Sequence, residues 1–179
     1  MNLIILDRDG VINYDSDDYI KSEEEWEAIP GSLDAIARLN RAGYRIVVAT
    51  NQSGLASGKF TYADLHAIHR KMHTHLGQYG GSIEAIFFCP HAPEDDCSCR
   101  KPKPGMLHEI SRRLRKPLYK SIFIGDKISD VQAALSVKAK PILVKTGKGK
   151  DTLASKDLPK EVPIYNDLAS ATDALLNTE

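Results

Sequence analysis

The stretch Leu3-Ile4-Ile5-Leu6-Asp7-Arg8-Asp9-Gly10 decides the fold of this chain. Four consecutive apolar residues bounded by polar ones predict a short strand buried on both faces, as in a parallel sheet. Carboxylates follow at alternate positions, so Asp7 and Asp9 are expected to project together beyond the carboxyl end of the strand. Like charges held so close favour a bound cation or one raised pKa. An ordinary Asp-Gly turn is the alternative for this stretch taken alone.

Further apolar runs alternate with helical patterns along the chain. Strands are expected at residues 45–49, 85–88, 121–124, 141–144 and 162–165. Helices are expected at residues 32–41, 62–76, 105–114, 129–137 and 167–176. This alternation predicts an α/β fold in which helices cover both faces of a mostly parallel sheet.

Length and charge narrow the class of protein. The 179 residues suffice for one domain with a genuine core, so a single domain is expected over residues 1–179. Lys plus Arg equals Asp plus Glu at 24 each, which gives no general attraction to nucleic acid or membranes. The first residues do not resemble a signal peptide, and no uncharged run approaches the ~20 residues of a membrane span. A cytoplasmic protein acting on a small molecule is expected.

Polar groups end three of the predicted strands. Asp7 and Asp9 follow the first, Thr50-Asn51-Gln52-Ser53-Gly54 ends the second, and Gly125-Asp126-Lys127 follows the strand at 121–124. The carboxyl ends of parallel strands face one crevice, so these groups should converge there. Three carboxylates with water make the oxygen-rich site that magnesium prefers, and a substrate phosphate would complete its shell.

A phosphate site is predicted beside the carboxylates. Thr50, Ser53 and the amides of the Gly-containing turn would hold phosphate oxygens. Arg100-Lys101 is the best source of a compact positive charge for the same group.

The segment 89–104 contains every cysteine of the chain. The pattern Cys89-x-His91-x5-Cys97-x-Cys99 supplies three thiols and an imidazole, enough for a closed, structural zinc site. Buried free cysteines are the alternative, and nucleic-acid binding is a further one that the neutral charge disfavours. Zinc would pin the loop that carries Arg100 and Lys101 to the crevice.

The motifs Asp7-x-Asp9-Gly10, Thr50, Lys101 and Gly125-Asp126-x-x-x-Asp130 resemble those of haloacid dehalogenase superfamily phosphatases. They occur in the order of that superfamily. The resemblance implies a Rossmann-like fold. No large insertion separates Asn13 from the first helix or Phe60 from the third strand, so a member without a cap domain is expected.

The resemblance also implies a mechanism. Asp7 would attack phosphorus and form an aspartyl phosphate, and Asp9 would act as acid and then as base. The Asp7 carboxylate, the Asp9 backbone carbonyl and Asp126 would hold Mg²⁺. Thr50 and Lys101 would hold the transferring phosphoryl group. Asp130 is expected to orient Lys101 or to cap the following helix, with direct metal ligation as the alternative.

Within the superfamily, the chain is most similar to the family of D-glycero-D-manno-heptose 1,7-bisphosphate 7-phosphatases. The similarity rests on residues 50–54, 89–91, 97–102 and 103–106. It implies release of the C7 phosphate, with the 1-phosphate product used for nucleotide-activated heptose and lipopolysaccharide, and a monomer. The implied substrate-binding residues are Asp15, Ser16, Asp17, Asp18, Asn51, Gln52, Ser53, Arg100 and Lys127. Ser57 departs from the arginine common in that family.

Two other functions stay open at this point. Histidinol-phosphate phosphatases resemble the chain in the catalytic motifs and the zinc loop, although they commonly carry aspartate where Ser53 stands. A catalytically silent, zinc-stabilised binding module is the second alternative. The histidines at 66, 69 and 73 fall on one helix face and are interpreted as a partly exposed surface rather than a metal site. Trp26 is expected to pack the acidic loop at 13–29 against the domain.

Overall fold

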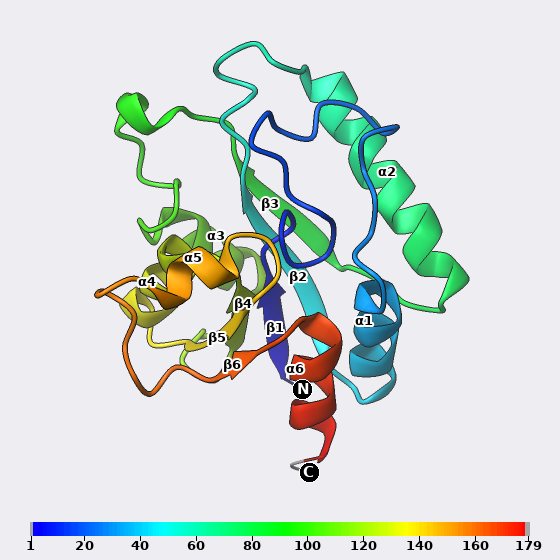
Figure 1. Cartoon of the computed structure of the whole chain (residues 1–179), viewed down its shortest axis with the longest axis vertical. Coiled ribbons are helices and arrows are strands. Elements are labelled where there is room, and N and C mark those ends of the chain that lie inside the picture. The colour runs from blue at the N-terminus through cyan, green and yellow to red at the C-terminus, as the bar shows by residue number, and fades with distance from the viewer. Residues whose placement is uncertain (1, 178–179) are drawn as a thin grey trace.

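The structure is a computed structural model that describes residues 2–177. Six strands form one sheet in the order β3-β2-β1-β4-β5-β6, and all five pairings are parallel (Figure 1). The strands are β1 (Leu3–Leu6), β2 (Arg45–Asn51), β3 (Ala85–Cys89), β4 (Ile122–Gly125), β5 (Lys140–Val144) and β6 (Ile164–Tyr165). The predicted parallel sheet is confirmed, and the last strand is shorter than expected.

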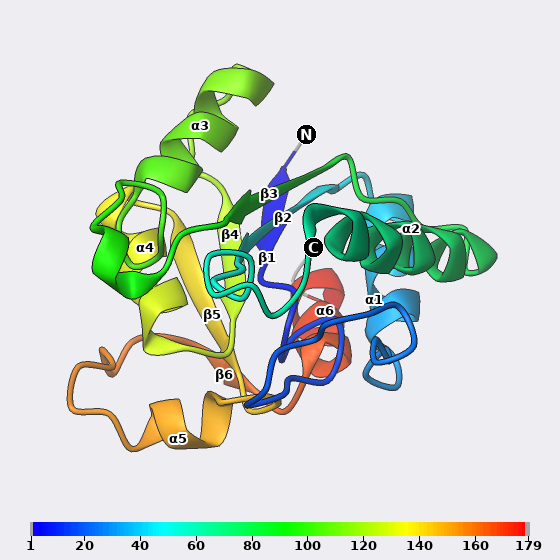
Figure 2. The same ribbon diagram turned by 90° about the horizontal axis from the view of Figure 1, so that it is seen from above.

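Helices cover both faces of the sheet, as predicted. They are α1 (Ser32–Arg41), α2 (Tyr62–Gln78), α3 (Gly105–Leu114), α4 (Ile128–Ser136), α5 (Gly149–Leu153) and α6 (Leu168–Asn177), with a short 3-10 helix at Pro93–Asp95. Figure 2 shows α1, α2 and α6 on one side and α3 and α4 on the other. The sequence did not predict α5 and the 3-10 helix, because both are too short to show a periodic pattern. Within residues 2–177, no helix combines the length and apolar character of a membrane span.

The alternation of side chains along β1 explains why both layers form. Ile4 and Leu6 lie in one core cluster with residues of α1, α2 and α6. Leu3 and Ile5 lie in a second cluster with residues of α3 and α4. Successive side chains of a strand point to opposite faces, so an unbroken apolar run serves two layers.

The strand order places the carboxyl ends of β1 and β4 beside each other. The chain moves outward from β1 to β2 and β3, then returns to β4 on the other side of β1. Connections that diverge from two adjacent strands leave a crevice outside their carboxyl ends, which is where ligands bind in such sheets.

The acidic loop after β1 is fixed by Trp26, as predicted. Its side chain is 2% exposed and belongs to the core cluster beneath α1 and α2. Lys71 of α2 donates from Nζ to the carbonyl oxygens of Glu23, at 2.6 Å, and Trp26, at 3.0 Å. The loop is therefore attached to α2 by packing and by two charge-assisted hydrogen bonds.

Replacing Trp26 with alanine should lower the free energy of unfolding by about 3–5 kcal/mol, because it leaves a cavity beneath the loop. Denaturant unfolding followed by circular dichroism measures the change. Tyr79→Ala is the matched control, since that ring is 51% exposed and its loss should change stability little. Equal effects of the two substitutions would contradict the assignment of Trp26 to the core.

Candidate active site

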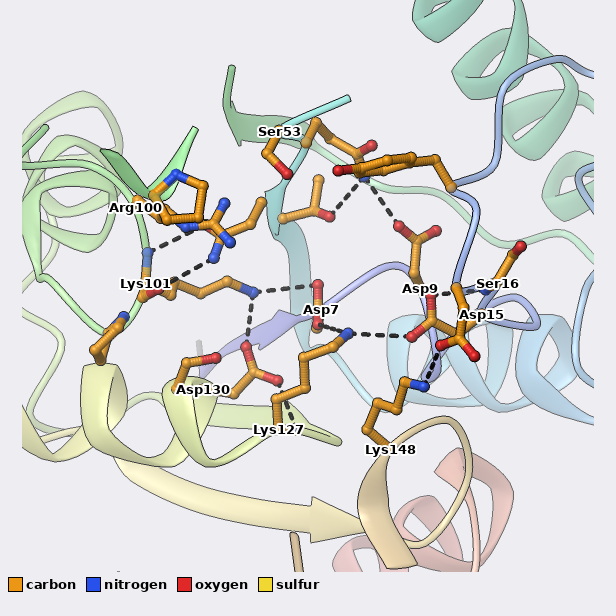
Figure 3. Close-up of a pocket in the computed structure, with 18 residues that line it drawn as sticks. Asp7, Asp9, Asp15, Ser16, Ser53, Arg100, Lys101, Lys127, Asp130 and Lys148 are labelled. Atoms are coloured by element: carbon orange, nitrogen blue, oxygen red, sulfur yellow. Dashed lines mark hydrogen bonds and ion pairs between the residues drawn. The ribbon is translucent and has the colours of Figure 1, made fainter. Parts of the chain in front are cut away.

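Loops from the first five strands meet around one cavity of about 500 Å³ at the carboxyl edge of the sheet (Figure 3). Of the residues predicted from sequence, the lining contains Asp7, Asp9, Asp15, Ser16, Asp17, Thr50, Asn51, Gln52, Ser53, Arg100, Lys101 and Lys127. The predicted convergence of distant loops is therefore present. Asp18 differs, because its side chain is 70% exposed and pairs with Lys21 at 3.0 Å instead of lining the cavity.

Asp7 stands at the end of β1 and is 3% exposed. Its backbone N–H donates to the carbonyl of Ile124 at 3.0 Å, which extends the pairing of β1 with β4 by one residue. Its Oδ1 accepts from the Arg8 backbone N–H at 2.8 Å and lies 3.1 Å from Lys101 Nζ. Burial alone would raise the pKa of Asp7, but Lys101 and Lys127 outweigh it and hold the pKa below its usual range. Asp7 is therefore an ionised carboxylate facing the cavity.

Lys101 reaches the site from the loop after β3 and is 3% exposed. Its Nζ donates to the Ala49 carbonyl at 2.7 Å and to Asp130 Oδ1 at 2.7 Å, and it lies 3.1 Å from Asp7 Oδ1. Burial disfavours the charged amine, but Asp130 and Asp7 raise its pKa above the ordinary value. The arrangement fixes a positive charge beside Asp7.

Asp130 makes both of the contacts expected of it. Oδ1 binds the Lys101 ammonium, while Oδ2 accepts the backbone N–H groups of Asp126 at 3.2 Å and Lys127 at 3.1 Å. The second pair of contacts caps the start of α4. Both carboxylate oxygens are thus engaged by the protein, which favours the orienting role over direct metal ligation.

Asp126 directly follows β4, and the backbone of two other loops approaches its carboxylate closely. Its Oδ2 accepts the Lys148 backbone N–H at 2.8 Å. Its buried Oδ1 has no hydrogen-bond donor among residues 2–177, and Lys127 Nζ lies 3.6 Å away. A Cβ added at Gly10 or Gly147 would come within 2.2 or 2.3 Å of Oδ2, so these two positions need glycine to admit the carboxylate.

The charges around Asp126 fit a divalent cation. Burial is the largest effect on Asp126 and raises its pKa to about 8. Lys127 opposes this shift, whereas the charges of Asp7 and Asp130 add to it. Carboxylate oxygens of all three acids lie within 4.8 Å of one another. An orphaned oxygen on a carboxylate that is reluctant to ionise is what a hard cation would satisfy.

Asp9 is held by donors from three other side chains. Its Oδ1 accepts from Arg8 Nε at 2.8 Å and from Asn13 Nδ2 at 2.9 Å. Its Oδ2 accepts from Gln52 Nε2 at 3.1 Å. The carboxylate lies in the cavity wall with a fixed orientation (Figure 3).

The three histidines lie on a partly exposed helix face, as expected, but His69 is its buried member. His66 and His73 are exposed, but His69 is buried and lies 3.0 Å from Arg8 Nη1 through its Nε2. Burial, and next the charge of Arg8, lower the pKa of His69 to about 3. The helical spacing did not reveal this contact, because the partner is 61 residues away in the sequence.

The residues at the end of β2 form a second wall. Gln52 Nε2 donates to Thr50 Oγ1 at 3.0 Å as well as to Asp9. Asn51 makes a reciprocal pair of 3.1 Å bonds with the backbone of Lys101, so it positions the loop after β3. Arg100, in that loop, has a buried Nη1 without a hydrogen-bond partner among residues 2–177.

The predicted substrate loop approaches two lysines. Lys127 Nζ lies 3.4 Å from Asp15 Oδ2, and Lys148 Nζ forms an ion pair with Asp17 (Figure 3). Asp15, Ser16 and Asp17 therefore cover the side of the cavity formed by the loops after β4 and β5.

Lys148 is the main residue that sequence analysis missed. Its position after β5 follows the rule used for the other loops, but nothing in the sequence placed β5 near β1. Other lining residues that were not predicted as site residues are Tyr19, Pro93, Pro102 and Ser129.

The four predicted zinc ligands lie together in the loop after β3. Cys97 Sγ is 3.6 Å from Cys89 Sγ and 3.7 Å from Cys99 Sγ, and His91 Nδ1 is 3.3 Å from Cys99 Sγ. Tetrahedral zinc holds sulfur ligands about 3.8 Å apart, so the spacing fits. Burial is the largest effect on Cys89 and raises its pKa to about 12, so a cation is needed for that thiol to ionise.

Comparison with known proteins identifies relatives over nearly the whole chain. A family model described as HAD-hydrolase-like matches residues 98–171. D-glycero-beta-D-manno-heptose-1,7-bisphosphate 7-phosphatase of Bordetella bronchiseptica is 53% identical over 176 residues, covering 98% of each chain. The protein of the same name from Escherichia coli K12 is 36% identical over 183 residues, covering 98% of this chain and 88% of its own.

Solved structures agree with the sequence relatives. The crystal structure of D,D-heptose 1,7-bisphosphate phosphatase from B. bronchiseptica, complexed with magnesium and phosphate, matches with a TM-score of 0.97 at 52% identity and covers 100% of both chains. The corresponding protein from Burkholderia thailandensis matches with a TM-score of 0.78 at 41% identity, covering 98% of this chain and 99% of its own.

Replacing Asp130 with asparagine should lower the free energy of unfolding by about 3 kcal/mol, because it leaves the buried Lys101 charge with Asp7 alone. Chemical denaturation at neutral pH measures the loss. The double variant Asp130→Asn/Lys101→Met should be less destabilised than the sum of its single substitutions. Strict additivity in this cycle would contradict the ion pair.

Proposed function

The chain belongs to the haloacid dehalogenase-like hydrolases, as a phosphoric monoester hydrolase, and we propose that it removes the C7 phosphate of D-glycero-D-manno-heptose 1,7-bisphosphate. The observation that carries the proposal is the ionised Asp7 beside Lys101 in a cavity of about 500 Å³. The names and 51–53% identities of relatives from three organisms support the heptose substrate. The heptose 1-phosphate product would serve the synthesis of nucleotide-activated heptose for lipopolysaccharide.

Asp7 would act as the nucleophile. Its carboxylate attacks the C7 phosphorus in line, and the bond from phosphorus to the sugar oxygen breaks. Asp9 gives its proton to the departing oxygen, then takes a proton from the water that hydrolyses the aspartyl phosphate. Thr50 and Lys101 would hold the transferring phosphoryl group during both displacements.

The carboxylates of Asp7 and Asp126, with the Asp9 backbone carbonyl, would hold Mg²⁺. When bound, the ion would screen the negative charge between Asp7 and the phosphate. The orphaned Oδ1 of Asp126 supports this assignment.

The remaining cavity walls would recognise the sugar bisphosphate. Asp15, Ser16 and Asp17 are placed to bind hydroxyl groups, and Arg100 and Lys127 to bind anionic oxygens. Asn51, Gln52 and Ser53, which line the cavity at the end of β2, would also contact the substrate. A single domain, a monomeric state and a cytoplasmic location stay predictions.

The proposed activity is tested by magnesium-dependent phosphate release from heptose 1,7-bisphosphate and from histidinol phosphate. We expect kcat/KM to be at least about 100-fold higher for the bisphosphate, because its second phosphate would meet Arg100 or Lys127, which an amine-bearing substrate does not suit. Asp7→Asn should abolish turnover and leave the circular dichroism spectrum unchanged. A preference for histidinol phosphate would overturn the substrate assignment.

The stabilising effect of Mg²⁺ should increase with pH. Without a cation, folded Asp126 binds a proton that the unfolded chain has released, so stability falls as pH rises from about 4 to about 8. Mg²⁺ would replace that proton, so adding Mg²⁺ should raise the melting temperature of the protein more at about pH 8 than at about pH 6. Asp126→Asn should lose this pH-dependent increase. An effect of Mg²⁺ that is equal at both pH values would argue against Asp126 as a ligand.

We also propose that Cys89, His91, Cys97 and Cys99 bind one structural zinc ion. The purified protein should contain about one equivalent of zinc by elemental analysis, and Cys99→Ser should lose most of it and melt at a lower temperature. Ser98→Ala, a change at an exposed site in the same loop, should keep both properties. Full zinc content in the cysteine variant would exclude this ligand set.

A further inference from the structure

We propose that His69 is a positioning residue for catalysis, which acts through Arg8 to fix the orientation of the acid–base carboxylate Asp9. The proposal rests on the proposed function, because it concerns the step in which Asp9 protonates the sugar oxygen. Neither His69 nor Arg8 is among the site residues predicted from the sequence.

In the hydrogen bond between Arg8 and His69, only one assignment of donor and acceptor is possible. An arginine side chain has no acceptor, so Nη1 must donate and the Nε2 of His69, 3.0 Å away, must accept. His69 is then neutral, with its ring proton on Nδ1. The lowered pKa of His69 agrees with a neutral ring across the physiological range.

Arg8 connects this histidine with Asp9. Its side chain is fully buried, its Nε donates to Asp9 Oδ1 at 2.8 Å, and its Nη2 lies 2.8 Å from the same oxygen. A buried guanidinium has few ways to be satisfied, so the acceptor on α2 and the carboxylate after β1 together determine its orientation.

The consequence is a difference between the two oxygens of Asp9. Oδ1 is surrounded by donors from Arg8 and Asn13, which leaves no room for a proton on it. Oδ2 accepts from Gln52 Nε2 alone among the bonds described. Oδ2 is therefore the oxygen with room to exchange a proton with the sugar oxygen, whose bond to phosphorus breaks in the same step.

Removing the acceptor on His69 should disturb this arrangement. A buried Nη1 without a partner would favour a different guanidinium orientation, and Oδ1 of Asp9 would lose part of its clamp. Displacement of a catalytic group by about 1 Å can lower a rate by as much as 100-fold. The effect should be confined to substrates whose leaving oxygen needs a proton.

The test compares kcat/KM for heptose 1,7-bisphosphate and for p-nitrophenyl phosphate, whose leaving group departs without protonation. This constant reports the first displacement only, so hydrolysis of the intermediate does not affect it. His69→Leu and His69→Phe should lower it at least about tenfold for the bisphosphate and less than about twofold for the aryl ester. His69→Gln, whose Oε1 can replace Nε2 as acceptor, should recover most of the activity.

His66→Leu is the matched control, because it removes an exposed histidine from the same helix. A parallel fall for both substrates, or no fall in the histidine variants, would overturn the positioning role. If the apolar variants do not fold, ¹⁵N NMR of the His69 ring in the wild-type protein tests the proposal instead. The expected result is a neutral ring with its proton on Nδ1, and a charged ring or a proton on Nε2 would contradict the proposal. A wild-type protein without phosphatase activity would instead refute the proposed function.

Discussion

Charge balance at the carboxyl ends of β1 and β4 is the constraint on which the rest of the site depends. Asp7, Asp126 and Asp130 place carboxylate oxygens within 4.8 Å of one another, and the ammonium groups of Lys101 and Lys127 lie among them. Three buried negative charges against two positive ones are costly, and the raised pKa of Asp126 expresses that cost. A divalent cation would remove the imbalance, and it would then leave cationic groups available to an anionic ester.

The surrounding elements hold these charges in place from several directions. Asn51 binds the backbone of Lys101, Asp130 binds its ammonium, and the cysteine cluster lies in the loop that carries it. Gly10 and Gly147 let two loops approach the Asp126 carboxylate. A site that needs its groups within fractions of an ångström is thus built on sheet ends and short braced loops, with the longer acidic loop attached to α2 through Trp26.

The sequence predicted much of this because its strongest signals are local. The apolar run before Asp7 indicated a doubly covered strand, and the periodic pattern of Ser32–Arg41 gave that helix its observed bounds. The sequence could not reveal contacts that depend on which loops become neighbours in space. Lys148 joins the site only because β5 lies two strands from β1, and His69 meets Arg8 only because α2 packs over the start of the loop after β1. Asp18, beside the correctly placed Asp17, turns outward to Lys21 because a loop has no fixed side-chain period.

We propose that this charge network makes the Asp7 carboxylate the group that attacks phosphorus. Rapid acid quenching during turnover of the heptose bisphosphate, followed by borohydride reduction and peptide mass spectrometry, tests it directly. Because borohydride reduces an acyl phosphate to an alcohol, we expect homoserine in place of aspartate at residue 7. Reduction at another carboxylate, or steady phosphate release without any modified residue, would contradict it.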